Sequence, residues 1–455
     1  MVCGCQTTVG FDGWTTATAE RAADRLASVK ILVIGSGARE HAIVHSLAQE
    51  TADGEGHELH AAPGNPGIGE LATLHRVDPL DNVAVVELAT RLGSELVVIG
   101  PEAPLVAGVA NAVRSAGIPV FGPSADAARL EGSKAFAKEV MAAAEVPTAM
   151  AHVCSTVDQV GDALDAFGPP YVVKDDGLAA GKGVVVTDVR LDAIRHAQAC
   201  FANPDRGGDP RVVIEEFLDG PEVSLFCISD GTTVVPLAPA QDFKRAFDGD
   251  AGPNTGGMGA YSPLPWAPEG LTDEVVARVA QPTIDEMRER GVPFVGVLYV
   301  GLALTSRGTR VIEFNARFGD PETQVVLARL ESPLSVLLFA AATGTLASSP
   351  RLRWRDEAAV TVVVAANGYP ADPAYGGEIT GVHDAESLPG VTVMQAGTAR
   401  DADGALVAAG GRVLSVVGVG EDLRSARRAA YAGIDKISLA GSHHRTDIAA
   451  KVAAS

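Results

Sequence analysis

The stretch "YVVKDDGLAAGKGVVV", residues 171–186, places a glycine-rich segment with two lysines between two runs of β-branched residues. A Walker A loop needs G-x-x-x-x-G-K-[ST] leading from a strand into a helix. Here Lys182 is followed by Gly183, and the next residues have the composition of a strand. The stretch therefore predicts a hairpin whose loop amides approach an anion, with Lys174 supplying positive charge. A mobile hairpin with solvated lysines is the alternative interpretation.

Outward from this hairpin, the pattern of strands and helices divides the chain into three domains. From residue 29 to 125, runs such as "KILVIGSG" and "ELVVIGP" alternate with helical stretches, which predicts a parallel sheet. Residues 126–352 contain strands without regular helical crossovers, which predicts an α+β domain. Residues 353–455 restart with strands and short turns as a smaller domain. Residues 1–28 are expected to be a disordered extension.

Composition narrows the class of protein. The chain has 455 residues, 36 Lys and Arg against 57 Asp and Glu, and a net charge of −21, which argues against nucleic-acid binding. Its five cysteines are scattered, so we expect reduced thiols, and Cys3 and Cys5 have no nearby partners for a metal site. Neither a membrane span nor a signal peptide is recognisable. We expect a cytoplasmic enzyme or binding protein.

"VIEFNARFGDPE" is the strongest candidate for a metal site. Glu313 and Asn315 alternate with Ile312 and Phe314, so both oxygen-bearing side chains share one face of a strand. Mg²⁺ is commonly held by one or two such side chains together with substrate phosphates. Arg317, just beyond the strand, is placed to stabilise charge on a phosphoryl group. An exposed sheet face with a polar turn is the alternative.

Two other groups of motifs point to ligands. "VVIEEFLDGPEVS" ends a strand at Glu215 and places Glu222 seven residues later, so its backbone suits an adenine edge and a carboxylate suits ribose hydroxyls. "IGSGAREHA" resembles a dinucleotide turn, but Glu40 occupies the third glycine position, which weakens a nicotinamide cofactor. Together with "APGNPG" and "IGPEAPL", this turn predicts a site for a phosphorylated substrate at the ends of parallel strands.

With these motifs in place, the chain resembles the phosphoribosylamine–glycine ligase family (glycinamide ribonucleotide synthetases), ATP-grasp enzymes of purine biosynthesis. The resemblance runs from about residue 30 to 445. It rests on "GSGAREHA", "PGNPG", "GSKAFAK", "YVVKDDGLAAGKGV", "AQDFKRAFDGDAGPNTGGMGAYSP" and "EFNARFGDPETQVVL", among others. It implies an α/β and α+β multidomain fold: a Rossmann-like N-terminal domain, an ATP-grasp central domain with a mobile lid at about 150–222, and a small C-terminal domain.

The resemblance implies that ATP, glycine and 5-phosphoribosylamine react through glycyl phosphate to glycinamide ribonucleotide, ADP and phosphate. ATP would contact Lys134, Lys174, Gly177, Gly181, Lys182, Gly183, Glu215, Glu216, Phe217, Leu218 and Glu222. Phosphoribosylamine would contact Gly35, Gly37, Arg39, Asn65 and Gly67. Glycine and the acyl phosphate would be bounded by Asp242, Lys244, Gly256 and Gly257. Mg²⁺ or Mn²⁺ would be held by Glu313 and Asn315. The catalytic residues would be Arg317, Lys174 and Asp242.

The chain departs from the family pattern at three places. Asp175 stands where alanine is usual, beside the phosphate loop, and its charge would oppose ATP unless the side chain points away. Phe243 stands where histidine is usual. The strand "VLYVGLAL" lacks the carboxylate that many ATP-grasp enzymes place next to the metal. The number of metal ions is therefore left open.

Alternatives remain at this point. The chain resembles a ligase, but another ATP-grasp ligase with a different acid or amine is possible on the same motifs. A nucleotide-binding sensor without turnover and an NAD-dependent dehydrogenase are further alternatives. We expect glycine and 5-phosphoribosylamine as partners, neither nucleic acid nor membrane, and a monomer or weak homodimer.

Overall fold

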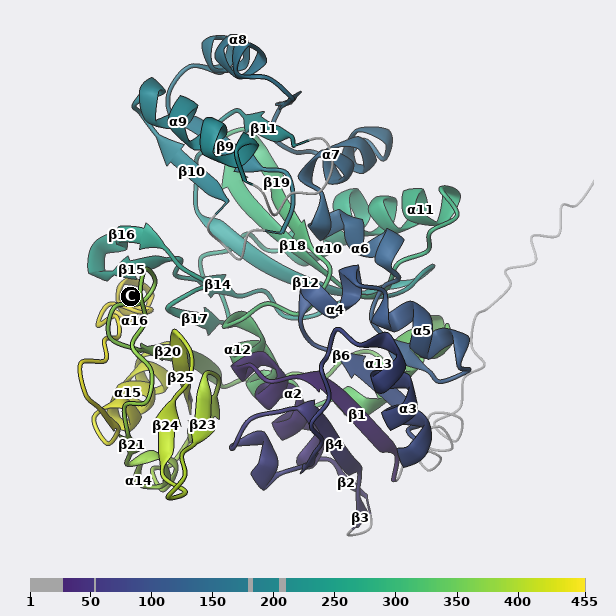
Figure 1. Ribbon diagram of the computed structural model, residues 1–455, viewed down its shortest axis with the longest axis vertical. Coiled ribbons are helices and arrows are strands. Elements are labelled where there is room, and N and C mark those ends of the chain that lie inside the picture. Colours follow the sequence, from purple (N-terminus) through teal and green to yellow (C-terminus); the bar gives the residue numbers. More distant parts are fainter. Residues whose placement is uncertain (1–27, 53–54, 179–182, 204–209, 455) are drawn as a thin grey trace, which may run out of the picture.

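The computed structural model describes residues 28–52, 55–178, 183–203 and 210–454. Nearly all of the predicted N-terminal extension, with Cys3 and Cys5, lies outside these residues. Figure 1 shows the N-terminal sheet and the C-terminal strands at the lower end of the molecule, with a separate small sheet at the upper end. The predicted multidomain α/β and α+β fold is confirmed.

The N-terminal domain is a parallel sheet in the order β5-β4-β1-β6-β7. Its strands are β1 (Lys30–Gly35), β4 (Glu58–Pro63), β5 (Thr73–Leu74), β6 (Leu96–Ile99) and β7 (Val120–Phe121). Its helices are α2 (Ala38–Ala48), α3 (Asn82–Leu92), α4 (Glu102–Val106), α5 (Val109–Ser115) and α6 (Ala125–Gly132). The strand order reverses at β1, so the glycine turn after β1 lies at the edge where such sheets bind ligands.

A second, four-stranded antiparallel sheet, here called the outer sheet, has the order β10-β9-β11-β8. Its strands are β8 (Ala151–Cys154), β9 (Tyr171–Asp175), β10 (Val184–Thr187) and β11 (Val212–Glu215). Helices α8 (Val157–Phe167) and α9 (Arg190–Phe201) pack on one face around Val160, Leu164 and Val173. The predicted hairpin is confirmed, because β9 and β10 pair with Lys174 opposite Val184.

The central sheet has the order β13-β12-β18-β19. Its strands are β12 (Glu222–Asp230), β13 (Val234–Pro236), β18 (Val295–Thr305) and β19 (Gly308–Asn315). The helices of this part are α7 (Lys134–Ala143), α10 (Leu271–Val275), α11 (Gln281–Glu289), α12 (Glu322–Arg329) and α13 (Leu334–Thr343). Between α10 and α11 the chain forms a π segment at Val276–Ala280, just before Pro282, which lacks an N–H for the regular ladder.

The last sheet crosses the boundary expected near residue 353. Its order is β14-β17-β20-β25-β22, and antiparallel pairing of β17 with β20 joins strands from the middle of the chain to strands near its end. Its strands are β14 (Gln241–Asp242), β17 (Gly259–Ser262), β20 (Ala358–Ala365), β22 (Val391–Gln395) and β25 (Arg412–Gly420). We call this the shared sheet, because β14, which carries Asp242, and β17 come from the middle of the chain, whereas the other three strands come from its C-terminal part.

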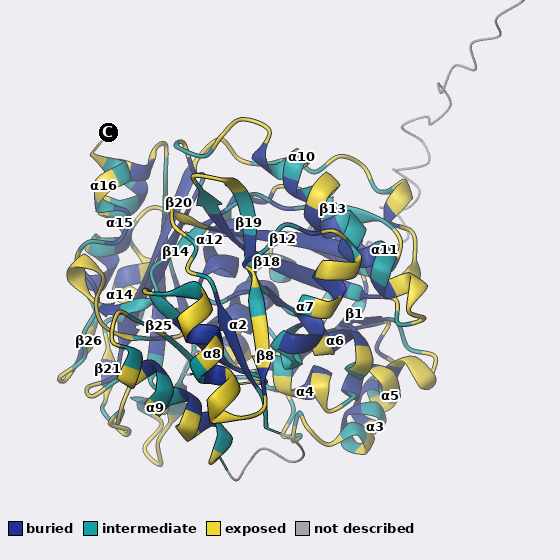
Figure 2. Cartoon of the chain, turned by 90° about the horizontal axis from the view of Figure 1, so that it is seen from above, coloured by how far each residue is buried: buried dark blue, intermediate teal, exposed yellow. Residues whose placement is uncertain are grey.

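Short elements complete the C-terminal part and its neighbour. They are β15 (Arg245–Phe247), β16 (Ala251–Asn254), β21 (Ile379–Thr380), α14 (Val382–Glu386), β23 (Thr398–Arg400), β24 (Leu406–Ala408), α15 (Leu423–Ile434), β26 (Ser438–Leu439) and α16 (Ala450–Ala453). In Figure 2 most strands of the central part are buried and the outward residues of the surrounding helices are exposed, whereas β8 of the outer sheet carries exposed residues. Among the described residues, no helix combines the length and apolar character needed to cross a membrane.

Candidate functional site

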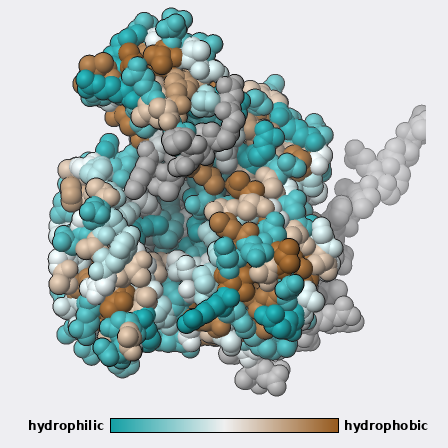
Figure 3. All heavy atoms as spheres, in the orientation of Figure 1, coloured by the Kyte–Doolittle hydropathy of each residue, from teal (hydrophilic) through white to brown (hydrophobic). Residues whose placement is uncertain are grey.

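A cleft of about 1330 Å³ lies where the outer, central and shared sheets meet. Figure 3 shows the surface hollowed beneath the outer sheet, with largely hydrophilic residues around the hollow. The predicted residues that line it are Arg39, Lys134, Lys174, Gly177, Gly183, Glu215, Glu216, Phe217, Leu218, Glu222, Asp242, Lys244, Gly256, Glu313, Asn315 and Arg317. Gly181 and Lys182 lie outside the described residues. The cleft therefore collects most of the predicted nucleotide, metal and glycine residues in one place.

Two buried lysines share the carboxylate of Glu215. Nζ of Lys174 lies 2.7 Å from Oε2, and Nζ of Lys138 lies 3.0 Å from Oε1. Burial lowers the pKa of the Lys138 ammonium, and the charge of Glu215 opposes that shift. Lys174 also donates to the carbonyl of Ile312 at 3.0 Å, which connects β9 to β19. Because the Glu215 carboxylate is engaged with these lysines, the predicted contact of Glu215 with adenine would have to use its backbone.

The start of the glycine-rich loop is fastened to helix α7. Lys134 Nζ donates to the carbonyl of Gly177 at 3.0 Å. The carboxylate of Asp176 accepts hydrogen bonds from Ser133 Oγ at 3.0 Å and from the Ala135 N–H at 3.1 Å. These contacts place the lysine of α7 beside the root of the loop, where both can face the same phosphates.

Strand β19 places the predicted metal ligands on the face of the cleft. Burial alone would raise the pKa of the Glu313 carboxyl. Nearby cations, of which Lys244 contributes most, lower this pKa by a larger amount, so the net shift is downward. Asn315 Oδ1 accepts a hydrogen bond from Arg317 at 3.2 Å. Gly301 is the residue opposite Glu313 on β18, and a Cβ at this position would lie 3.3 Å from Cγ of Glu313, so the Glu313 side chain packs directly over the glycine.

Arg317 is held by carboxylates from two other elements. Its Nη2 lies 2.9 Å from Glu131 Oε1, and its Nε lies 3.3 Å from Glu102 Oε2 at the start of α4. Burial lowers the pKa of the guanidinium, but Glu131 and Glu102 raise it more strongly, so it is permanently charged. Glu131 also accepts from the backbone N–H of Ala316 at 2.8 Å. The guanidinium is therefore fixed beside Asn315 and links the central sheet to the N-terminal domain.

A second group of ionisable residues lies at the shared-sheet side of the cleft. Burial raises the pKa of Asp242 to about 7, Lys244 opposes this shift, and Glu322 adds to it. Lys244 pairs with Glu222, at the start of β12. Glu322 is buried and accepts from Tyr299 Oη at 2.7 Å. This group combines an ammonium with carboxylates, a donor set suited to an amino acid.

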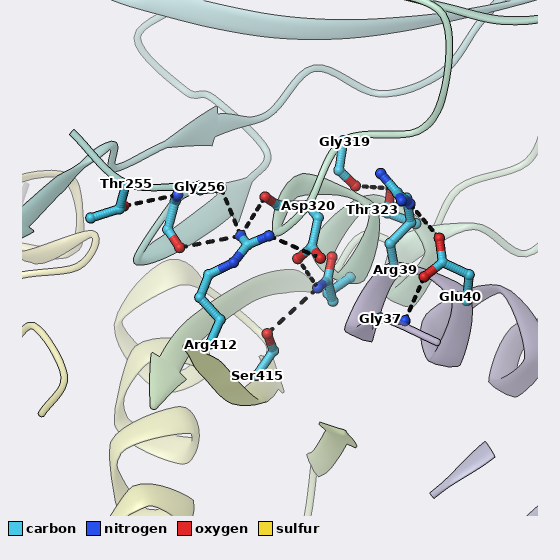
Figure 4. Close-up of polar contacts among 12 residues, drawn as sticks. Gly37, Arg39, Glu40, Thr255, Gly256, Gly319, Asp320, Thr323, Arg412 and Ser415 are labelled. Atoms are coloured by element: carbon cyan, nitrogen blue, oxygen red, sulfur yellow. Dashed lines mark hydrogen bonds and ion pairs between the residues drawn. The ribbon is translucent and has the colours of Figure 1, made fainter. Parts of the chain in front are cut away.

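The glycine turn after β1 is filled by a carboxylate of the chain itself (Figure 4). Glu40 accepts from the N–H of Gly37 and from Nε of Arg39, both at 2.6 Å. A Cβ at Gly35 would lie 2.6 Å from Glu40 Cγ, and one at Gly100 would lie 2.0 Å from Glu40 Oε1. The turn thus encloses Glu40 instead of facing the cleft, and Arg39 is the turn residue that lines the cleft.

Asn65 and Gly67 also lie away from the cleft. The Asn65 amide donates to the carbonyls of Ser36 and Gln395, each at 2.8 Å. A Cβ at Gly67 would lie 2.5 Å from Cε1 of His41 and 2.8 Å from Cδ of Gln395. Both residues bring the N-terminal domain against β22. Contact of Asn65 and Gly67 with phosphoribosylamine stays a prediction, as it does for Gly35 and Gly37. The positions of these residues, away from the cleft, do not support it.

The structure shows how two departures from the family pattern are accommodated. Strand alternation places Asp175 on the face opposite Lys174, it is buried, and it is not among the residues lining the cleft. Phe243 lines the cleft, and its ring lies 5.0 Å from the guanidinium carbon of Arg445 and 6.1 Å from the ring of Tyr261. An arginine from the C-terminal part therefore packs on the side chain that replaces histidine.

Several residues of the site were not predicted from the sequence. Lys138 follows Lys134 by one helical turn in "KAFAK", so i,i+4 spacing was a usable signal. Glu322 belongs to the quoted "FGDPE" motif. Glu102 belongs to the quoted "IGPEAPL" motif, but nothing local indicated that it contacts Arg317, 215 residues away in the chain, and Glu131 had no local signal.

Comparison with known proteins agrees with this geometry. Family models match residues 29–131 (phosphoribosylglycinamide synthetase, N domain), 132–323 (its ATP-grasp domain) and 359–451 (its C domain). A phosphoribosylamine–glycine ligase of Streptomyces coelicolor is 65% identical, covering 93% of this chain and 100% of the relative. One from Mycobacterium bovis is 55% identical, covering 93% and 99%.

Solved structures give the same result. The crystal structure of phosphoribosylamine–glycine ligase from Thermotoga maritima has a TM-score of 0.79 at 35% identity and covers 92% of this chain and 100% of its own. The biotin carboxylase domain of 2-oxoglutarate carboxylase from Hydrogenobacter thermophilus, determined with ADP and magnesium, has a TM-score of 0.68 at 16% identity, covering 91% and 92%. That second similarity shows the fold alone.

Fold and cleft together define an ATP-grasp enzyme. Within that class, the three matched domains and the identity to its members show that the chain belongs to the phosphoribosylglycinamide synthetase family.

Proposed function

We propose that this chain joins glycine to 5-phosphoribosylamine, forming glycinamide ribonucleotide while ATP is cleaved to ADP and phosphate. The observation that carries the proposal is the cleft, which brings the lysines of the outer sheet and α7, the Glu313–Asn315 pair and the Asp242–Lys244 group together. Membership of the family supports the choice of substrates.

The reaction needs an activated carboxylate, because the oxygen of free glycine carboxylate would leave as a strong base. Transfer of the γ-phosphoryl group to that oxygen makes glycyl phosphate and releases ADP. The amine of phosphoribosylamine then attacks the carbonyl carbon, the C–O bond breaks, phosphate leaves with the electron pair, and the nitrogen loses a proton. The protein therefore has mainly to position groups and to stabilise charge.

On the ATP side, Lys134 and Lys174 supply positive charge for the phosphates. Gly177 and Gly183, the described ends of the glycine-rich segment, line the cleft beside these lysines, and backbone amides at such glycines suit an anion. The Glu215–Leu218 segment frames adenine, and Glu222, which lines the same cleft, binds the ribose hydroxyls. The contacts of Lys174 with Glu215 and with Ile312 hold its ammonium in one place, so little reorganisation is needed when ATP binds.

Glu313 and Asn315 fit a hard divalent cation, and we propose that they hold Mg²⁺, with Mn²⁺ as an alternative. The lowered pKa of Glu313 keeps its carboxylate ionised. Among the described residues, no group of three His, Cys, Asp or Glu side chains is arranged to hold a metal ion. This agrees with a cation that takes its remaining ligands from phosphates and water. When bound, the cation neutralises charge on the phosphoryl oxygens.

On the acceptor side, Asp242 and Lys244 bound the pocket for glycine, whose ammonium and carboxylate they complement. Arg317 stabilises the charge of the acyl phosphate, since Glu131 and Glu102 hold its guanidinium beside Asn315. With a pKa of about 7, Asp242 is also able to accept a proton near neutral pH. We further propose a cytoplasmic location and a monomer or weak homodimer.

The test is release of ADP from Mg²⁺-ATP with glycine and freshly generated phosphoribosylamine, each omitted in turn. Release that requires all three, with glycinamide ribonucleotide formed in step, supports the proposal. ATP hydrolysis at a rate that does not depend on glycine or on the amine would contradict the proposed substrates. Glu313→Gln should abolish turnover, and Glu289→Ala, on the exposed end of α11, is the matched control. A wild type without turnover that still binds ATP would favour a sensor.

A further inference from the structure

Two side chains from the C-terminal part hold both backbone groups of Gly256. The N–H of Gly256 donates to Tyr369 Oη at 3.0 Å. The carbonyl of Gly256 accepts from Arg412 Nη1 at 2.6 Å. A Cβ at Gly256 would lie 2.9 Å from Cζ of Arg412, so the glycine also packs against the guanidinium. Gly256 and Arg412 both line the cleft, so the C-terminal part borders the site itself and also holds this peptide of the site.

Arg412 holds a second loop at the same time (Figure 4). Its Nη1 donates to the carbonyl of Asp320 at 2.7 Å, and its Nη2 lies 3.2 Å from Asp320 Oδ2. Asp320 follows the metal-binding strand in "EFNARFGD". The two loops also touch directly, because a Cβ at Gly257 would lie 2.4 Å from Cδ of Pro321. One guanidinium thus fixes the spacing between the "NTGG" and "GDPE" loops.

The loop held in this way is connected to the residues proposed to bind glycine. Thr255, next to Gly256, donates from its N–H and from Oγ1 to the carbonyl of Lys244, at 2.8 and 2.9 Å. Asp242 lies on β14, which is joined through β17 and β20 to β25, where Arg412 is the first residue. A shift of Gly256 is therefore passed to Lys244 through two hydrogen bonds.

We propose that Tyr369 and Arg412 are positioning residues for the first half-reaction, the phosphorylation of glycine, and that the C-terminal part completes the glycine site. This inference rests on the proposed function. The planar guanidinium of Arg412 suits this positioning role because its N–H groups donate to two carbonyls and a carboxylate at the same time. A lysine ammonium cannot match this pattern in the same geometry. A purely structural role would instead affect stability and leave glycine binding unchanged.

The test compares Arg412→Met, Arg412→Lys and Tyr369→Phe with two matched controls. The controls are Arg400→Met and Tyr375→Phe, because the Arg400 side chain is 54% exposed and Tyr375 is 66% exposed on the same part of the chain. The readouts are kcat and the separate KM values for glycine and ATP. A further readout is the glycine-dependent exchange of bridging and non-bridging oxygens in labelled ATP without the amine.

For Arg412→Met we expect KM for glycine to rise at least about ten-fold, with oxygen exchange falling in parallel and KM for ATP within about three-fold of wild type. Arg412→Lys should recover part of the loss. Tyr369→Phe should raise KM for glycine by about three-fold, since water can replace the hydroxyl at an exposed N–H. Both controls should behave as wild type.

An Arg412→Met protein with wild-type KM for glycine and wild-type oxygen exchange would overturn the inference while the proposed function stands. If that variant does not fold, the decision falls to Tyr369→Phe, and unchanged glycine kinetics there overturn the inference. A wild type that forms no glycinamide ribonucleotide in the same assay overturns the proposed function and this inference with it.

Discussion

Replacing Glu215 by glutamine should loosen the outer sheet far more than the loss of one surface charge would. The carboxylate lies between two ammonium groups, and the three side chains are between 4 and 12% exposed. Glutamine keeps the shape and one acceptor oxygen but removes the negative charge. Lys138 retains hydrogen bonds to Thr148 Oγ1 and Ala149, and Lys174 retains the one to Ile312. The variant therefore leaves both ammonium groups without the carboxylate that they contact directly.

Removing one partner of a buried ion pair costs about 3–5 kcal/mol. We take the lower end, about 3 kcal/mol, because both lysines keep other acceptors. Since about 1.4 kcal/mol is a factor of ten, protection of the β9 and β11 amides against hydrogen exchange should fall about 100-fold, provided that the outer sheet opens as a unit. Hydrogen exchange is preferred to melting, because a chain of several domains need not unfold in two states.

A double variant distinguishes charge balance from altered packing. Lys138→Met added to Glu215→Gln removes one of the uncompensated cations, so it should recover a large part of the lost protection and give a non-additive cycle. Asp165→Asn is the surface control, since its pair with Arg190 is 67% and 41% exposed and should contribute less than about 1 kcal/mol. Protection in Glu215→Gln within about three-fold of wild type would refute the reasoning.

Two further predictions concern ionisable groups at the cleft. Because the pKa of Asp242 is raised to about 7, its carboxylate forms as the pH rises through neutrality, so kcat/KM for glycine should increase between about pH 6 and about pH 8. Asp242→Asn should remove this inflection, and an inflection that persists in the variant would assign it to another group. Asp175→Ala should leave KM for ATP within about two-fold of wild type, because its side chain lies on the face opposite Lys174. A change of about ten-fold would mean that the Asp175 charge reaches the nucleotide.

Local spacing accounts for the features that sequence reasoning could predict. Period-2 alternation placed Glu313 and Asn315 on one face, and the two β-branched runs around the glycine-rich segment predicted the hairpin that carries Lys174. Alternating strands and helices predicted the parallel N-terminal sheet. In each case the signal lies within a dozen or so residues, where backbone geometry fixes the relative position of the side chains.

Contacts between distant segments account for what could not be predicted. Arg412 contacts Gly256, 156 residues earlier in the chain. Asn65 donates to the carbonyl of Gln395 across 330 residues. No period or motif encodes such pairs, because they depend on how completed sheets pack together. The glycine turn is a related case: its spacing predicts an anion site but does not indicate that the Glu40 carboxylate of the chain itself occupies the turn.

The Glu40 carboxylate in the glycine turn after β1 has a consequence for the binding of free anions. The carboxylate of Glu40 is tethered three residues from the amide of Gly37 that it binds. Even a flexible tether gives such a group an effective concentration in the millimolar range, and rigid placement raises it further. A free nucleotide or phosphate in solution would have to displace the Glu40 carboxylate, which is covalently part of the chain and stays close to the turn. The turn therefore keeps the glycine spacing of a dinucleotide-binding turn, but its anion position is occupied by a carboxylate of the chain itself.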